Sequence, residues 1–166
     1  MDASADSLDV LIDGLYVNRE LFSALFYPLC AKYRLTMTEM VILLYLDKHG
    51  PGSTAADIVE RLKITKSHIS TSVRDLTQRG YLRGSHAGND HRAIHLRLCG
   101  EAGQVAREGR RVQEEFLRVL LDGFDGAERE ALRSYMKRIN HNAAAYLRGK
   151  GNAKGENAQS CQNSET

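Results

Sequence analysis

The chain has 166 residues, 42% of them hydrophobic and 27% charged, which is the balance of a soluble globular protein long enough to bury a core. Its longest apolar run, Met40–Leu46, is far shorter than the ~18 residues that a membrane-spanning helix needs. Because the acidic N-terminus also lacks the apolar core of a signal peptide, we expect a cytoplasmic protein with no membrane partner.

Charge is spread unevenly along the chain. The net charge is only +2, but residues 61–97 hold eight Lys or Arg and two acidic residues, so this segment carries +6 and the remainder −4. Four of the six histidines fall in the same segment. A basic segment in an otherwise acidic chain is typical of a surface that binds a polyanion, although a solvated basic surface has the same composition.

The cysteines indicate no special chemistry. Cys30, Cys99 and Cys161 are an odd number at wide spacing, which favours neither a disulfide framework nor a zinc site, so no metal and no cofactor are expected. Cys30 lies on an apolar stripe, and a cysteine there is more typical of packing than of redox sensing.

The first helices are predicted by apolar spacing and by capping residues. Residues 8–33 have helical periodicity, and Pro28 should kink this helix or mark its last turns. Thr36 and Glu39 form a capping box for a second helix, 40–47, which is apolar nearly all round and therefore buried.

Two further helices follow the turn at residues 49–52. The pair Thr54 and Asp57 opens a helix that runs through Leu62. Thr65 is expected to cap the next helix, which reaches about Arg79 and ends before a glycine.

The period then changes from helical to alternating. Residues 81–83 and 93–98 are predicted as strands, joined by the polar, glycine-containing segment 84–92, so a β-hairpin with a long basic tip is expected. Helical spacing returns from residue 101 to about 121, and a last helix begins near residue 125. Residues 149–166 contain no aromatic residue and no Val, Ile, Leu or Met, so they are predicted to be a disordered tail.

This order predicts a mainly α fold with a small β-wing, a winged helix-turn-helix flanked by long helices. The long helices carry broader apolar faces than the small winged domain can cover, so they are expected to pack against a second copy of the chain. The predicted parts are an N-terminal dimerisation helix (1–34), the winged domain (35–100), C-terminal dimerisation helices (101–148) and the tail (149–166).

Three short segments carry family-like motifs: 56–70 is similar to A-x-x-L-x-x-x-x-S-K-S-x-V-S, 76–82 to L-x-x-x-G-L-V/I, and Asp90-His91-Arg92 to D-x-R. Through these motifs, in this order and spacing, the sequence resembles the MarR family of bacterial transcriptional regulators over roughly residues 8–148. The most specific of the three is Asp90-His91-Arg92, which looks like the family's wing signature. Thr71, Gly84 and Cys99 depart from the family pattern, which leaves the fold expectation intact but leaves the operator sequence open.

DNA recognition needs cations and hydroxyls for the phosphates and side chains that reach base edges. The fourth helix offers both, and the resemblance implies that Arg92 enters the minor groove and that Asp90 orients it. The predicted DNA-binding residues are Lys66, Ser67, His68, Ser70, Thr71, Arg74, Arg83, His86, Asp90 and Arg92. For each of them, an ordinary solvated surface is the alternative.

The resemblance also implies a site for a small-molecule effector where the dimerisation helices meet the winged domain. Its candidate residues are Tyr16, Arg19, Tyr27, Tyr33 and His49. The tyrosines could equally be packing residues of the dimer.

The sequence therefore predicts a homodimeric, ligand-responsive regulator, most simply a repressor, that binds a palindromic double-stranded DNA operator. The alternative is a winged-helix module for protein–protein contact without specific DNA binding. An enzyme is not expected, because no nucleophile–base cluster, metal-ligand spacing or glycine-rich phosphate loop is found.

Overall fold

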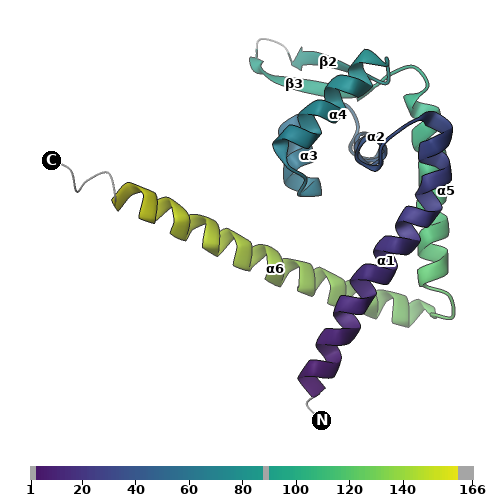
Figure 1. Ribbon diagram of the computed structural model, residues 1–166, viewed down its shortest axis with the longest axis vertical. Helices are drawn as coiled ribbons and strands as arrows, with labels where there is room; N and C mark the ends of the chain where they lie inside the picture. The colour runs from purple at the N-terminus through teal and green to yellow at the C-terminus, as the bar shows by residue number, and fades with distance from the viewer. Residues whose placement is uncertain (1–2, 88–89, 161–166) are drawn as a thin grey trace. The chain divides into compact units, whose positions relative to one another are not determined.

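We describe residues 3–87 and 90–160 of a computed structural model, which divides after Leu120 into two compact units that are taken separately. Within these residues, the first unit contains five helices and three strands, and the second contains one helix. Figure 1 follows the chain through both units. In chain order the elements are α1 (Ala3–Tyr33), α2 (Met37–His49), β1 (Ser53–Thr54), α3 (Ala55–Leu62), α4 (Lys66–Gln78), β2 (Leu82–Ala87), β3 (Asp90–Leu98), α5 (Ala102–Leu120) and α6 (Gly126–Ser160).

The core of the first unit is built around α2. Met40, Ile42 and Leu43 are fully buried, as expected for a helix that is apolar nearly all round. Ile58 of α3 and Ile69 of α4 are fully buried as well and belong to the same cluster. The winged helix-turn-helix architecture predicted from the sequence is confirmed.

Local side-chain bonds explain where the helices begin. Thr36 and Glu39 form the predicted capping box, with the Thr36 N–H donating to Glu39 Oε2 at 2.6 Å. The predicted box of Thr54 and Asp57 is also present, and its backbone bond is 2.7 Å long. The third predicted cap differs, because Thr65 stands at the N-cap of α4 without a capping bond and its hydroxyl lies 3.3 Å from Ser67 Oγ instead.

The sheet is larger than the sequence predicts. Its antiparallel strands have the order β1-β3-β2, and the two-residue β1 pairs Ser53 with Leu96 and Thr54 with His95. The hairpin strands run through Ala87 and start again at Asp90, so the expected loop over 84–92 was wrong over most of its length. Backbone pairing across the hairpin needs no apolar alternation, which is why the pattern underestimated these strands.

α5 packs closely on α2 because it carries a glycine at the contact. A Cβ on Gly109 would lie 2.8 Å from Leu44 Cδ2 and 3.4 Å from Met40 Sδ. Glycine weakens the interior of a helix, but at this position the absence of a side chain permits the close approach of α5 to α2. An ion pair between Arg110 of α5 and Asp47 of α2 joins the same two helices.

The second unit consists of α6 and the residues that lead into it. The backbone N–H of Asp125 donates to Glu128 Oε2 and the N–H of Glu128 donates to Asp125 Oδ1, both at 2.9 Å, which is the start predicted from the sequence. The predicted disordered tail differs from the structure over residues 149–160, where α6 continues to Ser160. Helical hydrogen bonds are local, so this part of the helix can continue without any apolar anchor. Residues 161–166 lie outside the described part.

Candidate nucleic-acid interface

α4 presents a polar face to solvent because its apolar stripe is narrow. Ile69 and Leu76 are fully buried and Val73 is half-buried, while the residues between them turn outward. Six predicted DNA-binding residues are exposed on this helix: Lys66, Ser67, His68, Ser70, Thr71 and Arg74. They form one continuous helical surface, which we call the α4 face.

The α4 face is not locked by strong internal contacts. Arg74 Nε lies 3.3 Å from Asp75 Oδ1, and the two side chains are 64% and 43% exposed. A surface ion pair of this kind contributes at most about 1 kcal/mol, so the guanidinium can exchange its carboxylate for a phosphate. The short hydroxyl side chains near the start of the helix would let its backbone approach a groove closely.

The turn between α3 and α4 sets the direction of the α4 face. Lys63 ends α3 in the left-handed conformation, with φ 56°, and its N–H donates to Val59 O. At the other end of α4, Gly80 has φ 75° and the N–H of Tyr81 donates to Leu76 O at 2.9 Å. This is the glycine stop that the sequence predicts, and it leads the chain directly into β2.

The outer face of the hairpin carries two cations directly opposite each other. Arg83 of β2 pairs in register with Arg97 of β3, and both residues are exposed. Like charges across a strand pair repel, so an anion bound between them would be stabilised. A Cβ placed on Gly84, the next residue of β2, would lie only 2.6 Å from Ile94 Cγ2. A larger residue at this position would therefore require the Ile94 side chain to move.

The remaining predicted wing residues are His86 on β2 and Asp90 and Arg92 on β3. Their backbone belongs to the hairpin, and His86 pairs in register with Ile94. Their side chains lie outside the described part, so their roles stay predictions.

The five predicted effector residues differ in exposure, and none of them lines either pocket described for this chain. Tyr16 and Tyr27 are 62% and 73% exposed, and the Arg19 guanidinium lies 5.8 Å from the Tyr16 ring centre. Tyr33 is half-buried and donates to Glu108 Oε1 at 2.8 Å, which favours a packing role. His49 lies at the end of α2, where its Nδ1 is 2.8 Å from Tyr45 O.

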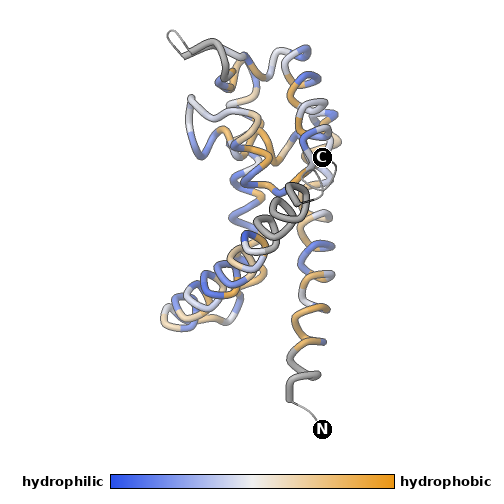
Figure 2. Tube along the Cα trace, turned by 90° about the vertical axis from the view of Figure 1, so that its left-hand side faces the viewer, coloured by the Kyte–Doolittle hydropathy of each residue, from blue (hydrophilic) through white to orange (hydrophobic). Residues whose placement is uncertain are grey.

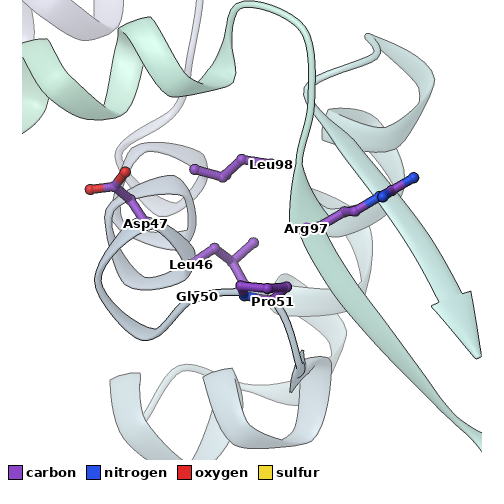
Figure 3. Close-up of a pocket in the computed structure, with 6 residues that line it drawn as sticks. All are labelled: Leu46, Asp47, Gly50, Pro51, Arg97 and Leu98. Carbon is purple, nitrogen blue, oxygen red and sulfur yellow. The ribbon is translucent and has the colours of Figure 1, made fainter. Parts of the chain in front are cut away.

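A pocket of about 390 Å³ lies beside the C-terminal end of α2 (Figure 3). Its lining residues are Leu46, Asp47, Gly50, Pro51, Arg97 and Leu98, and none of them is a predicted effector residue. In Figure 3 the Arg97 side chain points away from Leu46 and Pro51. The Asp47 carboxylate, which Figure 3 also shows, forms an ion pair with Arg110 of α5. Because neither charged group is directed into the pocket, we assign no ligand to it.

Cys30 is buried, and burial raises the pKa of its thiol, with a smaller contribution from the carboxylate of Glu39. A raised pKa and poor access are the opposite of what a reactive thiolate needs, which agrees with a packing role. Within the described residues, no group of His, Cys, Asp and Glu is arranged to hold a metal ion, and no helix is long and apolar enough to cross a membrane.

Sequence reasoning missed one residue that the structure makes prominent. Arg79, the C-cap residue of α4, was counted only as part of the basic segment, yet its guanidinium donates to Tyr33 O and Arg34 O at the end of α1. These partners are 45 and 46 residues away along the chain, so no local pattern could indicate the contact.

Comparison with known proteins agrees with this arrangement. Residues 35–93 match the model of the MarR family, and no curated protein sequence matches the chain. Among solved structures, the chain is similar to a MarR-family transcriptional regulator from Listeria monocytogenes complexed with a 26mer DNA, at 22% identity and a TM-score of 0.75 over 85% of this chain and 93% of that one.

Two further solved structures have the same fold. A MarR transcriptional regulator from Methanosarcina mazei Go1 is 14% identical, with a TM-score of 0.71 over 83% of this chain and 99% of that one. BpsR of Bordetella bronchiseptica, whose DNA binding is regulated by 6-hydroxynicotinic acid, is 21% identical, with a TM-score of 0.63 over 78% and 98% of the two chains.

Fold and comparisons together define the class of structure: a winged helix-turn-helix, with an exposed polar face on α4. Within that fold, residues 35–93 match the model of the MarR family, so the resemblance predicted from the sequence is confirmed over this segment.

Proposed function

We propose that the protein is a homodimeric, ligand-responsive transcriptional repressor that binds a palindromic DNA operator through the α4 face and the hairpin. The observation that carries this proposal is the α4 face itself, an exposed polar and basic helix surface on a MarR-type winged domain. It supports regulation by binding rather than catalysis.

The proposed contacts divide into two kinds. Lys66 and Arg74, which are exposed, are proposed to neutralise phosphates, whereas the exposed serine and threonine hydroxyls and His68 are proposed to contact base edges. Arg83 and Arg97 add cations on the outer face of the hairpin. By the family resemblance, Arg92 is the residue proposed to enter the minor groove.

Exposed apolar residues support the dimer. On the N-terminal half of α1, Leu11 is 56%, Leu15 70% and Val17 62% exposed, and α6 by itself exposes Tyr135 and Tyr146. Orange stretches in Figure 2 mark the apolar turns of α1 above its N-terminus. Surfaces of this kind are typical of interfaces, so we propose that residues 1–34 and 101–148 form the dimerisation helices.

Ligand response is proposed by analogy with BpsR, whose DNA binding is regulated by an aromatic carboxylic acid. Tyr16, Arg19 and Tyr27 remain candidates because their side chains are exposed and could contact such a molecule. An effector must bind one dimer conformation more tightly than the other, since equal affinity shifts no equilibrium.

The first test is to select bound sites from random DNA and then measure affinity for the selected operator as a function of salt. Lys66→Ala and Arg74→Ala should each weaken binding and reduce the magnitude of the salt slope by about one, because each removes about one phosphate contact. Arg92→Ala should cost roughly 1–3 kcal/mol, the size of a lost specific contact.

The matched control is Arg107→Ala, which removes an exposed arginine from α5. Its affinity and salt slope should equal those of the unmodified protein. If the protein selects no DNA, the proposal gives way to a module for protein–protein contact. Repeating the measurement with hydroxylated aromatic carboxylic acids then tests the ligand response, and constant affinity would leave a constitutive DNA binder.

A further inference from the structure

One side chain joins the end of the α4 helix to the end of α1. Arg79 Nη2 donates to Tyr33 O at 2.7 Å and Nη1 donates to Arg34 O at 2.9 Å. Nη1 also lies 3.7 Å from Glu39 Oε1, in the first turn of α2. The guanidinium carbon is 4.9 Å from the centre of the Tyr81 ring, directly after α4.

The carbonyls of Tyr33 and Arg34 lie at the C-terminal end of α1, where they require a hydrogen-bond donor from outside the helix. α1 ends with Arg34 in the left-handed conformation, at φ 51°, and with the Leu35 N–H donating to Cys30 O at 2.8 Å. The last carbonyls of a helix have no partner within the helix and carry its negative dipole end. A planar guanidinium can serve both with its two nitrogens, which a lysine ammonium cannot do in the same geometry.

The carboxylate beside Arg79 is itself fixed. Glu39 is 5% exposed and accepts the backbone N–H of Thr36 at 2.6 Å as part of the capping box of α2. The guanidinium therefore lies between two carbonyls and a held carboxylate, and its own side chain is 34% exposed. These contacts occupy the groups with which Arg79 could otherwise reach a phosphate.

We propose that Arg79 is a positioning residue, which holds the α4 helix at a set angle to α1 and thereby sets the spacing between the two α4 helices of the dimer. The inference depends on the proposed function, because α1 is the helix whose other end is proposed to bind the second subunit. Two recognition helices must reach adjacent major grooves about 34 Å apart, so a small rotation of α4 on α1 changes which operators fit.

The test compares Arg79→Gln with Arg110→Gln. Both variants remove one positive charge and one ion pair between elements, but Arg110 contacts Asp47 and so joins α5 to α2 without α4. Affinity is measured, well below the melting temperature, for the selected operator and for versions with one or two base pairs added or removed between the half-sites. Amide hydrogen exchange of each variant is measured without DNA.

Arg79→Gln should lower affinity for the matched operator by about threefold to thirtyfold, the usual range for coupling between separate sites, and should reduce the preference over altered spacings. Its salt slope should stay unchanged. Exchange should become faster at residues 33–36 and 76–82, with no change elsewhere. Arg79→Lys should give an intermediate spacing preference, and Arg110→Gln should keep the preference of the unmodified protein.

Three outcomes would overturn the inference. A smaller salt slope in Arg79→Gln would show that Arg79 contacts a phosphate. An unchanged spacing preference together with lower thermal stability would show a purely structural helix cap. If the unmodified protein binds no DNA, the proposed function fails. In that case, unchanged hydrogen exchange of Arg79→Gln at 33–36 and 76–82 would also reject the connection that Arg79 makes between α1 and α4. Faster exchange at those residues would support that connection alone.

Discussion

The two ends of α1 contrast strongly although both are rich in apolar residues. Toward its C-terminus, Phe26 is fully buried and Leu29 is 8% exposed, and both belong to the core of the first unit. Toward its N-terminus, Leu15 and Val17 are more than half exposed. The same composition therefore completes a core at one end and leaves an uncovered surface at the other.

The two ends differ because other helices of the same chain pack against only one of them. At the C-terminal end, α2 and α5 supply partners, and the Phe22 ring contacts both Phe26, at 4.4 Å between centres, and Phe116 of α5, at 5.4 Å. In the first unit no such partner covers the described N-terminal residues from Leu8 to Val17, several of which are strongly exposed. We infer that one end contributes to folding of the subunit and the other to its assembly.

Phe26→Ala should have the largest effect on stability. Removing a fully buried aromatic ring leaves a cavity and typically costs about 3–5 kcal/mol of the free energy of unfolding. Chemical denaturation at two protein concentrations provides the measurement, and the loss should be similar at both. A loss below about 1 kcal/mol would contradict the assignment of this end to the core.

Leu15→Glu should act on assembly instead. A carboxylate placed in the proposed interface would have to be buried without a partner, so the dimer should dissociate while the subunit stays folded. Sedimentation at micromolar concentration should give a dimer for the unmodified protein and a monomer for this variant, with helical content retained.

Leu15→Met is the matched control, because it keeps the apolar surface and the helix, and it should remain dimeric. A monomeric unmodified protein would reject the proposed interface outright. If Leu15→Glu stays dimeric, the interface lies elsewhere on the chain.

Local features of the fold were predictable because their causes are local. The capping boxes at Thr36 and Thr54 and the glycine stop after α4 depend on residues three or four apart, and all three were confirmed. The exposed α4 face follows from the narrow apolar stripe of Ile69 and Leu76. Its role in DNA binding stays a prediction, since exposure alone does not identify a ligand.

The features that sequence missed depend on partners distant in the chain. β1 exists only because Ser53 and Thr54 pair with β3, and two residues carry no alternation to detect. From the sequence alone, Gly109 indicates only a lower helix propensity, because its contact with Leu44 and Met40 of α2 exists only in the folded chain. The Arg79 link likewise needs α1 and α4 to be folded together first.

The smallest expected effect concerns pH and again belongs to the buried end of α1. Glu108 of α5 accepts from Lys32 Nζ at 2.7 Å and from the Tyr33 hydroxyl at 2.8 Å. These bonds, first that of Lys32 and then that of Tyr33, lower the pKa of Glu108 from 4.5 to about 2. Its folded-state pKa is below the unfolded value, so its contribution to stability is present above pH 4.5 and is lost as pH falls to about 2.

Glu108→Gln should therefore flatten the stability profile between pH 4.5 and about 2, which denaturation across that range would measure. The change should be modest, because Lys32 is 56% and Glu108 25% exposed and solvent screens the pair. The control is Glu114→Gln, which changes an exposed residue of the same helix. This variant should lose stability at acidic pH to the same extent as the unmodified protein. Parallel profiles for Glu108→Gln and the unmodified protein would mean that this contact does not help to hold α1 on α5. The packing of the C-terminal end of α1 would then depend on its apolar residues alone, and the contrast with the exposed N-terminal end would be one of hydrophobic burial only.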